Sequence, residues 1–141
     1  MLEKTRTCGN IVIIAGFIGV EVADELKRAG KNVTIVEIMD SLLPISFDPD
    51  FGGLARKEIE AENLKVYTSR KVVEIYGSKS VEGVKLDNGE NIPADVAILT
   101  TDYKHNTDLA QQLGLKIAEH DFTETDEYMR TSRPDVFAAG D

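Results

Sequence analysis

Two glycines and one carboxylate stand at intervals that suit the binding of a dinucleotide. Gly16 and Gly19 follow an apolar run, Ile11–Ile14, which is typical of a buried strand. Glu37 follows a second apolar run, Val33–Val36, and a helical pattern lies between the two runs. Strand, glycine turn, helix, strand and acid form, in this order, the pattern of a dinucleotide-binding βαβ unit.

The turn itself offers the candidate phosphate-binding residues Ala15, Gly16, Phe17, Ile18 and Gly19. Glycine permits the dihedral angles of a sharp strand-to-helix turn and lets the backbone come close to a pyrophosphate. The last glycine lets the helix pack against the strand. Phosphates would then lie on the unpaired N–H groups of the helix N-terminus, where the helix dipole favours negative charge.

The acid at the end of the second strand indicates which dinucleotide is preferred. Glu37 lies about 20 residues beyond the turn, as the pattern requires. Its carboxylate is suited to accept hydrogen bonds from ribose hydroxyls and would repel a 2′-phosphate. The pattern therefore favours NAD(H) over NADP(H).

One glycine of the full G-x-G-x-x-G pattern is missing. Ile14 occupies the first glycine position, either as a substitution or because a glycine has been lost after a complete strand. A β-branched side chain is expected to fit unusual dihedral angles poorly and to crowd the phosphate path. The turn alone therefore supports two readings equally, a binding site and a βαβ unit that keeps its fold and binds nothing.

Composition limits the classes of function. The chain has 141 residues and a net charge of −9, which argues against nucleic-acid and anionic-membrane partners. No apolar stretch approaches the roughly 20 residues of a membrane span. A lone cysteine, Cys8, excludes an internal disulfide and favours a cytoplasmic location. The length predicts a single domain over 1–141.

Periodicity predicts the elements that position these residues. A helix over 17–29 would bury a face made of Ile18, Val22, Leu26 and Ala29. Asp48 and Pro49 are typical of a helix start, and we expect that helix to reach Glu62 with an interruption at Gly52-Gly53. A short strand over 64–67 follows.

From residue 72 the sequence pattern predicts antiparallel strands. Runs at 72–75, 81–86 and 91–93, with a turn at Asp87-Asn88-Gly89, predict a three-stranded meander. A buried strand over 95–100, a short helix over 107–113, and strands over 124–131 and 136–139 complete the expected order.

These segments resemble the NAD-binding domain of the pyridine nucleotide–disulfide oxidoreductase family, which includes NADH oxidases and coenzyme A–disulfide reductases. The resemblance covers the chain from about Asn10 to Asp141. It is carried by AGFIGVE at 15–21, VTIVE at 33–37, LDNGENIPAD at 86–95, NTDLA at 106–110 and TDEYMRTSRPDVFAAGD at 125–141. It implies an α/β, Rossmann-like fold whose central parallel sheet has helices on one side and the meander on the other.

The resemblance also implies partners and roles. In the family this domain is inserted in an FAD domain and followed by an interface domain, and we expect neither of these within residues 1–141. Asp141 matches an aspartate that contacts the flavin, and Glu21 matches a glutamate near the nicotinamide, although it also reads as an ordinary surface acid of a helix. No catalytic residue is expected, since Cys8 matches no redox cysteine of the family.

A second departure follows the strand over 95–100. The family has a G/A-x-G-x-[RK]-P-N pattern against the dinucleotide, whereas Thr100, Thr101, Asp102 and His105 stand here. The threonines are candidate hydrogen-bonding groups, and a carboxylate at 102 disfavours a pyrophosphate. Asp102, His105 and Asp108 have a spacing that also permits a metal or acid–base site, but a solvated polar loop is the preferred interpretation, and no metal site is predicted.

The sequence leaves two hypotheses for the function. The first is an NAD(H)-binding domain that, joined to an FAD domain, delivers hydride to flavin and is not redox-active alone. The second is an engineered or degenerate scaffold that has lost nucleotide binding. Because the sequence stops directly after an apolar run, we also expect self-association.

Overall fold

The computed structural model describes residues 6–44, 46–101 and 105–140. The chain divides into two compact units, Met1–Thr101 and Asp102–Asp141. That 1–141 acts as a single NAD-binding-type domain stays a prediction. No helix within the described ranges is long and apolar enough to cross a membrane.

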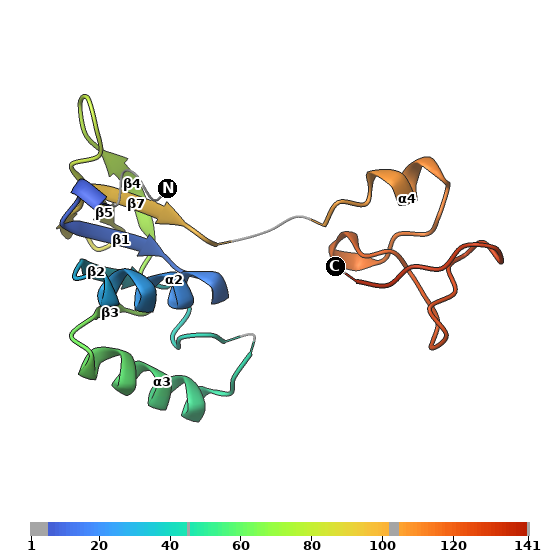
Figure 1. Ribbon diagram of the computed structural model, residues 1–141, viewed down its shortest axis with the longest axis horizontal. Helices are drawn as coiled ribbons and strands as arrows, with labels where there is room; N and C mark the ends of the chain where they lie inside the picture. Colours follow the sequence, from blue (N-terminus) through green and yellow to red (C-terminus); the bar gives the residue numbers. More distant parts are fainter. Residues whose placement is uncertain (1–5, 45, 102–104, 141) are drawn as a thin grey trace. The chain divides into compact units, whose positions relative to one another are not determined.

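The first unit is built on a parallel sheet with the strand order β3-β2-β1-β7 (Figure 1). Its strands are β1 (Asn10–Ile14), β2 (Asn32–Val36), β3 (Lys65–Tyr67) and β7 (Val96–Leu99). The register places Ile13 of β1 beside Ile35 of β2 and Ile98 of β7. All neighbouring strands run in the same direction, so their carboxyl ends meet at one edge of the sheet.

Two helices cover one face of this sheet, α2 (Phe17–Arg28) and α3 (Pro49–Ala61). The core on this face contains Ile11, Ile13, Val33, Ile35, Val66 and Ile98 from the strands, with Ala23 from α2 and Ile59 from α3 packed against it. Alternate residues of each strand point to the same face of the sheet, so this core takes every second residue of β1, such as Ile11 and Ile13.

An antiparallel meander covers the other face (Figure 1). It consists of β4 (Val72–Tyr76), β5 (Gly83–Leu86) and β6 (Asn91–Pro93). Its Val84, Leu86 and Ile92 pack against Val12 and Val36 of the parallel sheet, so consecutive residues of β1 serve two different cores. The predicted fold class, with helices on one side and the meander on the other, is confirmed.

Helix α3 has the predicted start but not the predicted interruption. α3 begins as expected, because the Asp48 side chain accepts a hydrogen bond from Phe51 N at 3.0 Å. The helix is not interrupted at its glycines, since Gly52 is buried against the loop at Ser41 and Leu42, where a Cβ would be tight.

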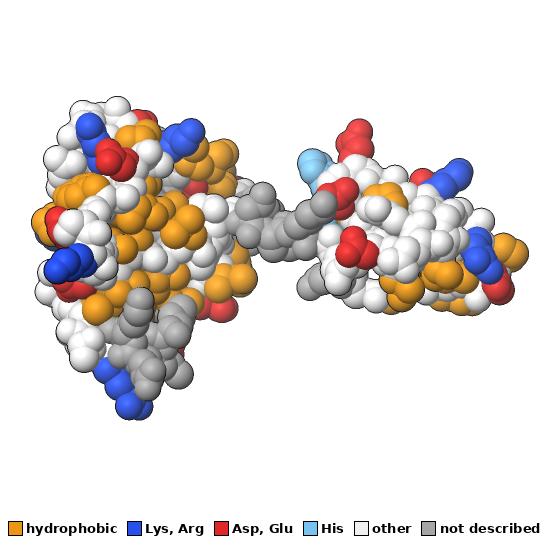
Figure 2. Space-filling model, turned by 90° about the horizontal axis from the view of Figure 1, so that it is seen from above, with side chains coloured by type: hydrophobic (Ala, Val, Ile, Leu, Met, Phe, Trp, Pro, Cys, Tyr) orange, Lys and Arg blue, Asp and Glu red, His pale blue; other side chains and the backbone are white. Residues whose placement is uncertain are grey.

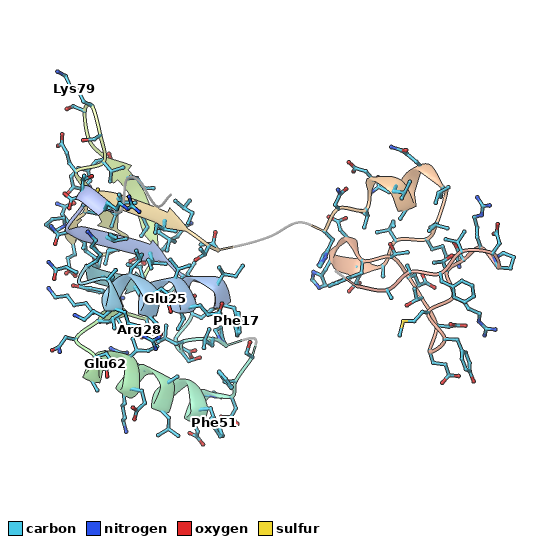
Figure 3. All side chains as sticks on the ribbon, in the orientation of Figure 1. Phe17, Glu25, Arg28, Phe51, Glu62 and Lys79 are labelled. Atoms are coloured by element: carbon cyan, nitrogen blue, oxygen red, sulfur yellow. The ribbon has the colours of Figure 1, made fainter. Side chains whose placement is uncertain are left out.

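The buried face of α2 agrees only in part with the predicted one: Val22 and Leu26 pack against the core as expected, whereas Ala29 is exposed. Gly19 and Ala23 are buried, whereas Ile18 is 56% exposed. Small residues lie inward because the helix runs very close to the sheet. The solvent face of α2 carries polar pairs such as Arg28 with Glu25 (Figure 3).

Two strand predictions need correction. Leu99, expected inside a buried strand, is 61% exposed because it lies at the open end of the sheet. The segments 124–131 and 136–139, both predicted as strands, do not form strands. They share a single antiparallel bridge, Arg130 with Phe137. Strand pairing needs a neighbour along its whole length, and no further strand lies beside them in the described residues of the second unit.

The second unit is small and locally folded. It contains α4 (Asp108–Gln112), which Thr107 precedes and Gly114, with φ of 69°, follows, close to the predicted helix over 107–113. A turn begins at Asp126, whose Oδ1 accepts hydrogen bonds from the backbone N–H groups of Tyr128 and Arg130 at 2.9 and 3.0 Å.

The start of β1 is held by one carboxylate. Oδ2 of Asp95 accepts hydrogen bonds from the backbone N–H groups of Asn10 and Gly9, each at 2.8 Å. These hydrogen bonds from Asn10 and Gly9 favour the ionised form, so the pKa of Asp95 lies below its usual range.

This predicts an acid-dependent contribution to stability. The Asp95 pKa is lowered on folding, so its stabilising effect is full above the ordinary carboxyl pKa of about 4 and is lost as the pH falls below it. Asp95→Asn should therefore lower stability at pH 7, and its difference from wild type should shrink below about pH 4. Urea unfolding at several pH values measures this, and a difference independent of pH would contradict it.

Candidate functional site

A cleft of about 620 Å³ opens at the carboxyl ends of the parallel strands in the first unit. Ligand sites of open α/β sheets lie at this edge. The lining residues come from three strand ends, the start of α2, the loop after β2 and the start of β4: Ile14, Ala15, Gly16, Phe17, Val36, Glu37, Ile38, Met39, Leu43, Pro44, Ser46, Arg70, Lys71, Val72, Leu99 and Thr101.

The missing glycine does not distort the backbone at this edge. Ile14 is the last residue of β1, where it pairs with Val36 of β2 and Leu99 of β7. The next residue, Ala15, donates its N–H to the carbonyl of Val36 at 2.8 Å. Ile14 thus keeps a strand conformation, and the expectation that its β-branched side chain meets unfavourable dihedral angles is wrong.

The two glycines of the turn are required by space and not by dihedral angle. Gly16 has φ of −176°, an extended conformation open to any residue. A Cβ on Gly16 would, however, overlap the carbonyl oxygen of Thr100. A Cβ on Gly19 would overlap Oγ1 of Thr100 and lie 3.0 Å from Cγ2 of Ile13. The start of α2 therefore rests directly on the end of β7.

Among the described residues, no side chain caps the N-terminus of α2, although Gly19 N donates to the carbonyl oxygen of Gly16 at 3.0 Å. Gly16 is the N-cap without a side-chain hydrogen bond, and no acidic residue stands in the first turn. In contrast, α3 is capped by Asp48 and carries Asp50 in its first turn. The first N–H groups of a helix have no acceptor within the helix. Phe17, at the start of α2 (Figure 3), lines the cleft, so this helix start presents donors and a positive dipole end there.

Glu37 supplies the acid of the cleft. It directly follows β2 and is only 6% exposed, although it lines the opening. Its Oε1 accepts a hydrogen bond from Met39 N at 3.0 Å, which fixes the carboxylate against the following loop. Two cations, Arg70 and Lys71, line the same cleft, and Arg70 N donates to the backbone carbonyl of Glu37 at 3.1 Å.

The rest of the opening is apolar. Ile38, Met39 and Leu99 are all at least half exposed, although they are large apolar side chains. Figure 2 shows that hydrophobic side chains gather on a face of the first unit. Apolar walls with a few polar groups are typical of small-molecule sites. No group of three or more His, Cys, Asp or Glu in the described part of the chain is arranged to hold a metal ion.

The structure brings together part of the predicted set. Ala15, Gly16, Phe17, Glu37 and Thr101 line the cleft. Of the others, Ile18 lies exposed in the first turn of α2, Gly19 is buried under that turn, Glu21 is exposed farther along α2, and the Thr100 hydroxyl donates to the Ile14 carbonyl. Asp102 and Asp141 lie outside the described residues. Cofactor binding by these residues stays a prediction.

Sequence reasoning missed the apolar and basic parts of the cleft. Val36 and Leu99 were foreseeable, because they end strands whose neighbour ends at Ile14. No sequence pattern indicated that Arg70 and Lys71 line the cleft, because only the fold brings the start of β4 to this edge.

Comparison with known proteins identifies the family. The profile of the family described as pyridine nucleotide-disulphide oxidoreductase matches residues 2–141. The chain belongs to this family. A relative from Methanocaldococcus jannaschii named NADH oxidase is 36% identical over 135 residues, which are 95% of this chain and 30% of the relative.

Solved structures of the family share the fold over almost the whole chain. An NAD-dependent persulfide reductase from A. fulgidus is 36% identical with a TM-score of 0.89, over 99% of this chain and 26% of that one. The water-forming NADH oxidase from Lactobacillus brevis, solved with NADH, is 31% identical with a TM-score of 0.85, over 99% and 31%. An engineered variant of that oxidase, solved with NADPH, is 29% identical with a TM-score of 0.84, over 99% and 31%.

The family relationship therefore concerns a portion of larger enzymes. The chain spans about a third or less of the length of the relatives it matches. This portion, by itself, holds the dinucleotide-type βαβ unit and the cleft.

A matched pair of glycine substitutions tests the packing of the turn. Gly16→Ala should destabilise the chain by about 1–3 kcal/mol, because the new Cβ meets the Thr100 carbonyl oxygen. Gly53→Ala should stabilise it by about 0.5–1 kcal/mol, since Gly53 lies within α3 with open space around it. Urea unfolding followed by circular dichroism gives both values. Equal effects of the two substitutions would refute the close contact.

Proposed function

We propose that the cleft binds NAD(H) and that this chain is the dinucleotide-binding part of a flavin-dependent oxidoreductase. The observation that carries the proposal is that the uncapped start of α2 and the buried carboxylate of Glu37 line one cleft. These are the two groups that a dinucleotide needs, one for its pyrophosphate and one for its adenosine ribose.

The pyrophosphate would lie at the start of α2. The N–H groups of Phe17 and Ile18 lie in the first turn and have no acceptor within the helix. Gly16 has no side chain to keep a phosphate away from this backbone. Arg70 and Lys71 add positive charge to the same cleft, which favours a ligand that carries two negative charges.

The ribose would lie at Glu37. A carboxylate accepts hydrogen bonds from both hydroxyls of an adenosine ribose but repels a phosphate on the 2′ oxygen. Burial strengthens this discrimination, because a charge that is little exposed is weakly screened. The residues present therefore fit NAD(H) better than NADP(H).

The engineered NADPH oxidase supports this placement. That variant carries replacements at a glycine, an aspartate, the alanine and methionine after that aspartate, and a proline. In this chain Gly19, Glu37, Ile38, Met39 and Pro44 stand at the same intervals. Four of the five, all but Gly19, line the cleft described above. The same cleft would thus select the dinucleotide here.

The flavin part of the reaction would lie outside this chain. When NADH is bound beside FAD, it supplies a hydride to the flavin. We expect an FAD domain as the partner of this domain, as the resemblance implies, and a cytoplasmic setting without nucleic acid or membrane. The chain alone would bind the dinucleotide and not turn it over.

A scaffold that has lost nucleotide binding is not favoured. Similarity to the family extends over nearly the whole chain. The turn without its first glycine also keeps a regular strand end at Ile14 and an uncapped start of α2.

Glu37→Gln tests the ribose site. The variant removes the charge but keeps an oxygen that can accept the hydrogen bond from Met39 N. By calorimetric titration, the wild-type chain should bind NADH and ADP-ribose more tightly than NADPH. The variant should lose roughly tenfold in NADH affinity and much of its preference over NADPH.

Asp40→Ala is the matched control. Asp40 is an exposed acid of the same loop and does not line the cleft, so its loss should leave the ratio of NADH to NADPH affinity unchanged. No heat with any of the three ligands would overturn the proposed function.

A change of cofactor preference follows from the same geometry. Glu37→Ala combined with Ile38→Arg and Pro44→Arg should make NADPH the tighter ligand in the same titration, because two cations replace one anion at the cleft. Gly19 should stay unchanged, since here an alanine would overlap Oγ1 of Thr100. A triple variant that still prefers NADH would show that the adenosine ribose lies elsewhere.

A further inference from the structure

One residue at the end of β7 makes two hydrogen bonds to one carbonyl of the glycine turn. Thr100 donates both its backbone N–H and its hydroxyl to the carbonyl oxygen of Ile14, each at 3.0 Å. Ile14 is the residue from which the chain enters the turn. A carbonyl oxygen has two lone pairs, so Thr100 occupies both and holds the turn at its start.

The same residue fixes the other end of the turn. Its carbonyl oxygen lies where a Cβ of Gly16 would be, and its Oγ1 lies where a Cβ of Gly19 would be. The first turn of α2 therefore sits on Thr100 through its backbone and its side chain together. Contacts at Ile14, Gly16 and Gly19 span the whole strand-to-helix connection.

Two departures from the family pattern meet at this point. Ile14 stands where the pattern has its first glycine, and Thr100 stands where it has glycine or alanine. A glycine or alanine at 100 has no hydroxyl, so it would hold the Ile14 carbonyl through its backbone alone. The hydroxyl is thus an additional bond at the very place where the turn has lost its first glycine.

We propose that Thr100 is a positioning residue whose hydroxyl holds the altered turn, so that the first N–H groups of α2 face the cleft. The role rests on the proposed function, because the ligand that would meet these N–H groups is the pyrophosphate of the dinucleotide. Thr100 itself does not line the cleft and acts through the turn.

Hydrogen exchange on the 141-residue chain tests whether Thr100 holds the turn. Thr100→Val keeps the shape and removes the hydroxyl, and Thr100→Ser keeps the hydroxyl. In the valine variant, the amides of Ala15 and Gly19, which donate to Val36 and Gly16, should exchange roughly threefold to tenfold faster. The serine variant should resemble the wild type.

The amide of Gly52 is the internal control. It donates to the carbonyl of Asp48 at the start of α3, in the same unit but away from Thr100. Its exchange should not change in either variant. Equal acceleration at Gly52, Ala15 and Gly19 would mean general destabilisation, and no acceleration would mean that the hydroxyl holds nothing. Either result overturns the proposal.

A titration with ADP-ribose tests the consequence for the ligand. Thr100→Val should bind ADP-ribose roughly threefold to tenfold more weakly, and Thr100→Ser should restore the affinity. Faster exchange with unchanged ADP-ribose affinity would overturn the positioning role and leave the proposed function intact. A wild-type chain that binds neither NADH nor ADP-ribose would overturn the proposed function, and with it the positioning of a ligand.

Discussion

The close contact between the start of α2 and the end of β7 is the constraint on which the rest of the site depends. The Thr100 backbone occupies the space that a side chain at Gly16 would need. This contact brings the uncapped helix end to the carboxyl edge of the sheet, where Glu37 already ends β2. Without it, the donors of the helix and the carboxylate would not line one cleft.

The sheet that carries this contact is covered on both faces. Ile13 faces the helices, while Val12 faces the meander, and both are almost completely buried. A shift of β1 by one residue would exchange the two faces along the whole strand. The register of β1 with β2 and β7 is therefore strongly specified, and the position of the turn at Ile14 follows from it.

Sequence reasoning succeeded where local pattern and tertiary structure agree. The βαβ unit, the meander with its turn at 87–89 and the cap at Asp48 were all predicted and found. It failed where packing against another element decides the outcome. Ile18 was assigned to the buried face of α2 by its spacing, yet Gly19 takes that face because the helix approaches the sheet too closely for a larger residue.

The sequence by itself determined the family and the order of the elements, because apolar periodicity, glycines and caps act over a few residues. It also placed Gly16 and Glu37 near a common site, since parallel strands end at one edge of a sheet. Only the tertiary structure decided why Gly16 must be glycine and that Arg70 shares its cleft. Both depend on contacts between segments that are far apart in the chain, and a local sequence pattern does not predict such contacts.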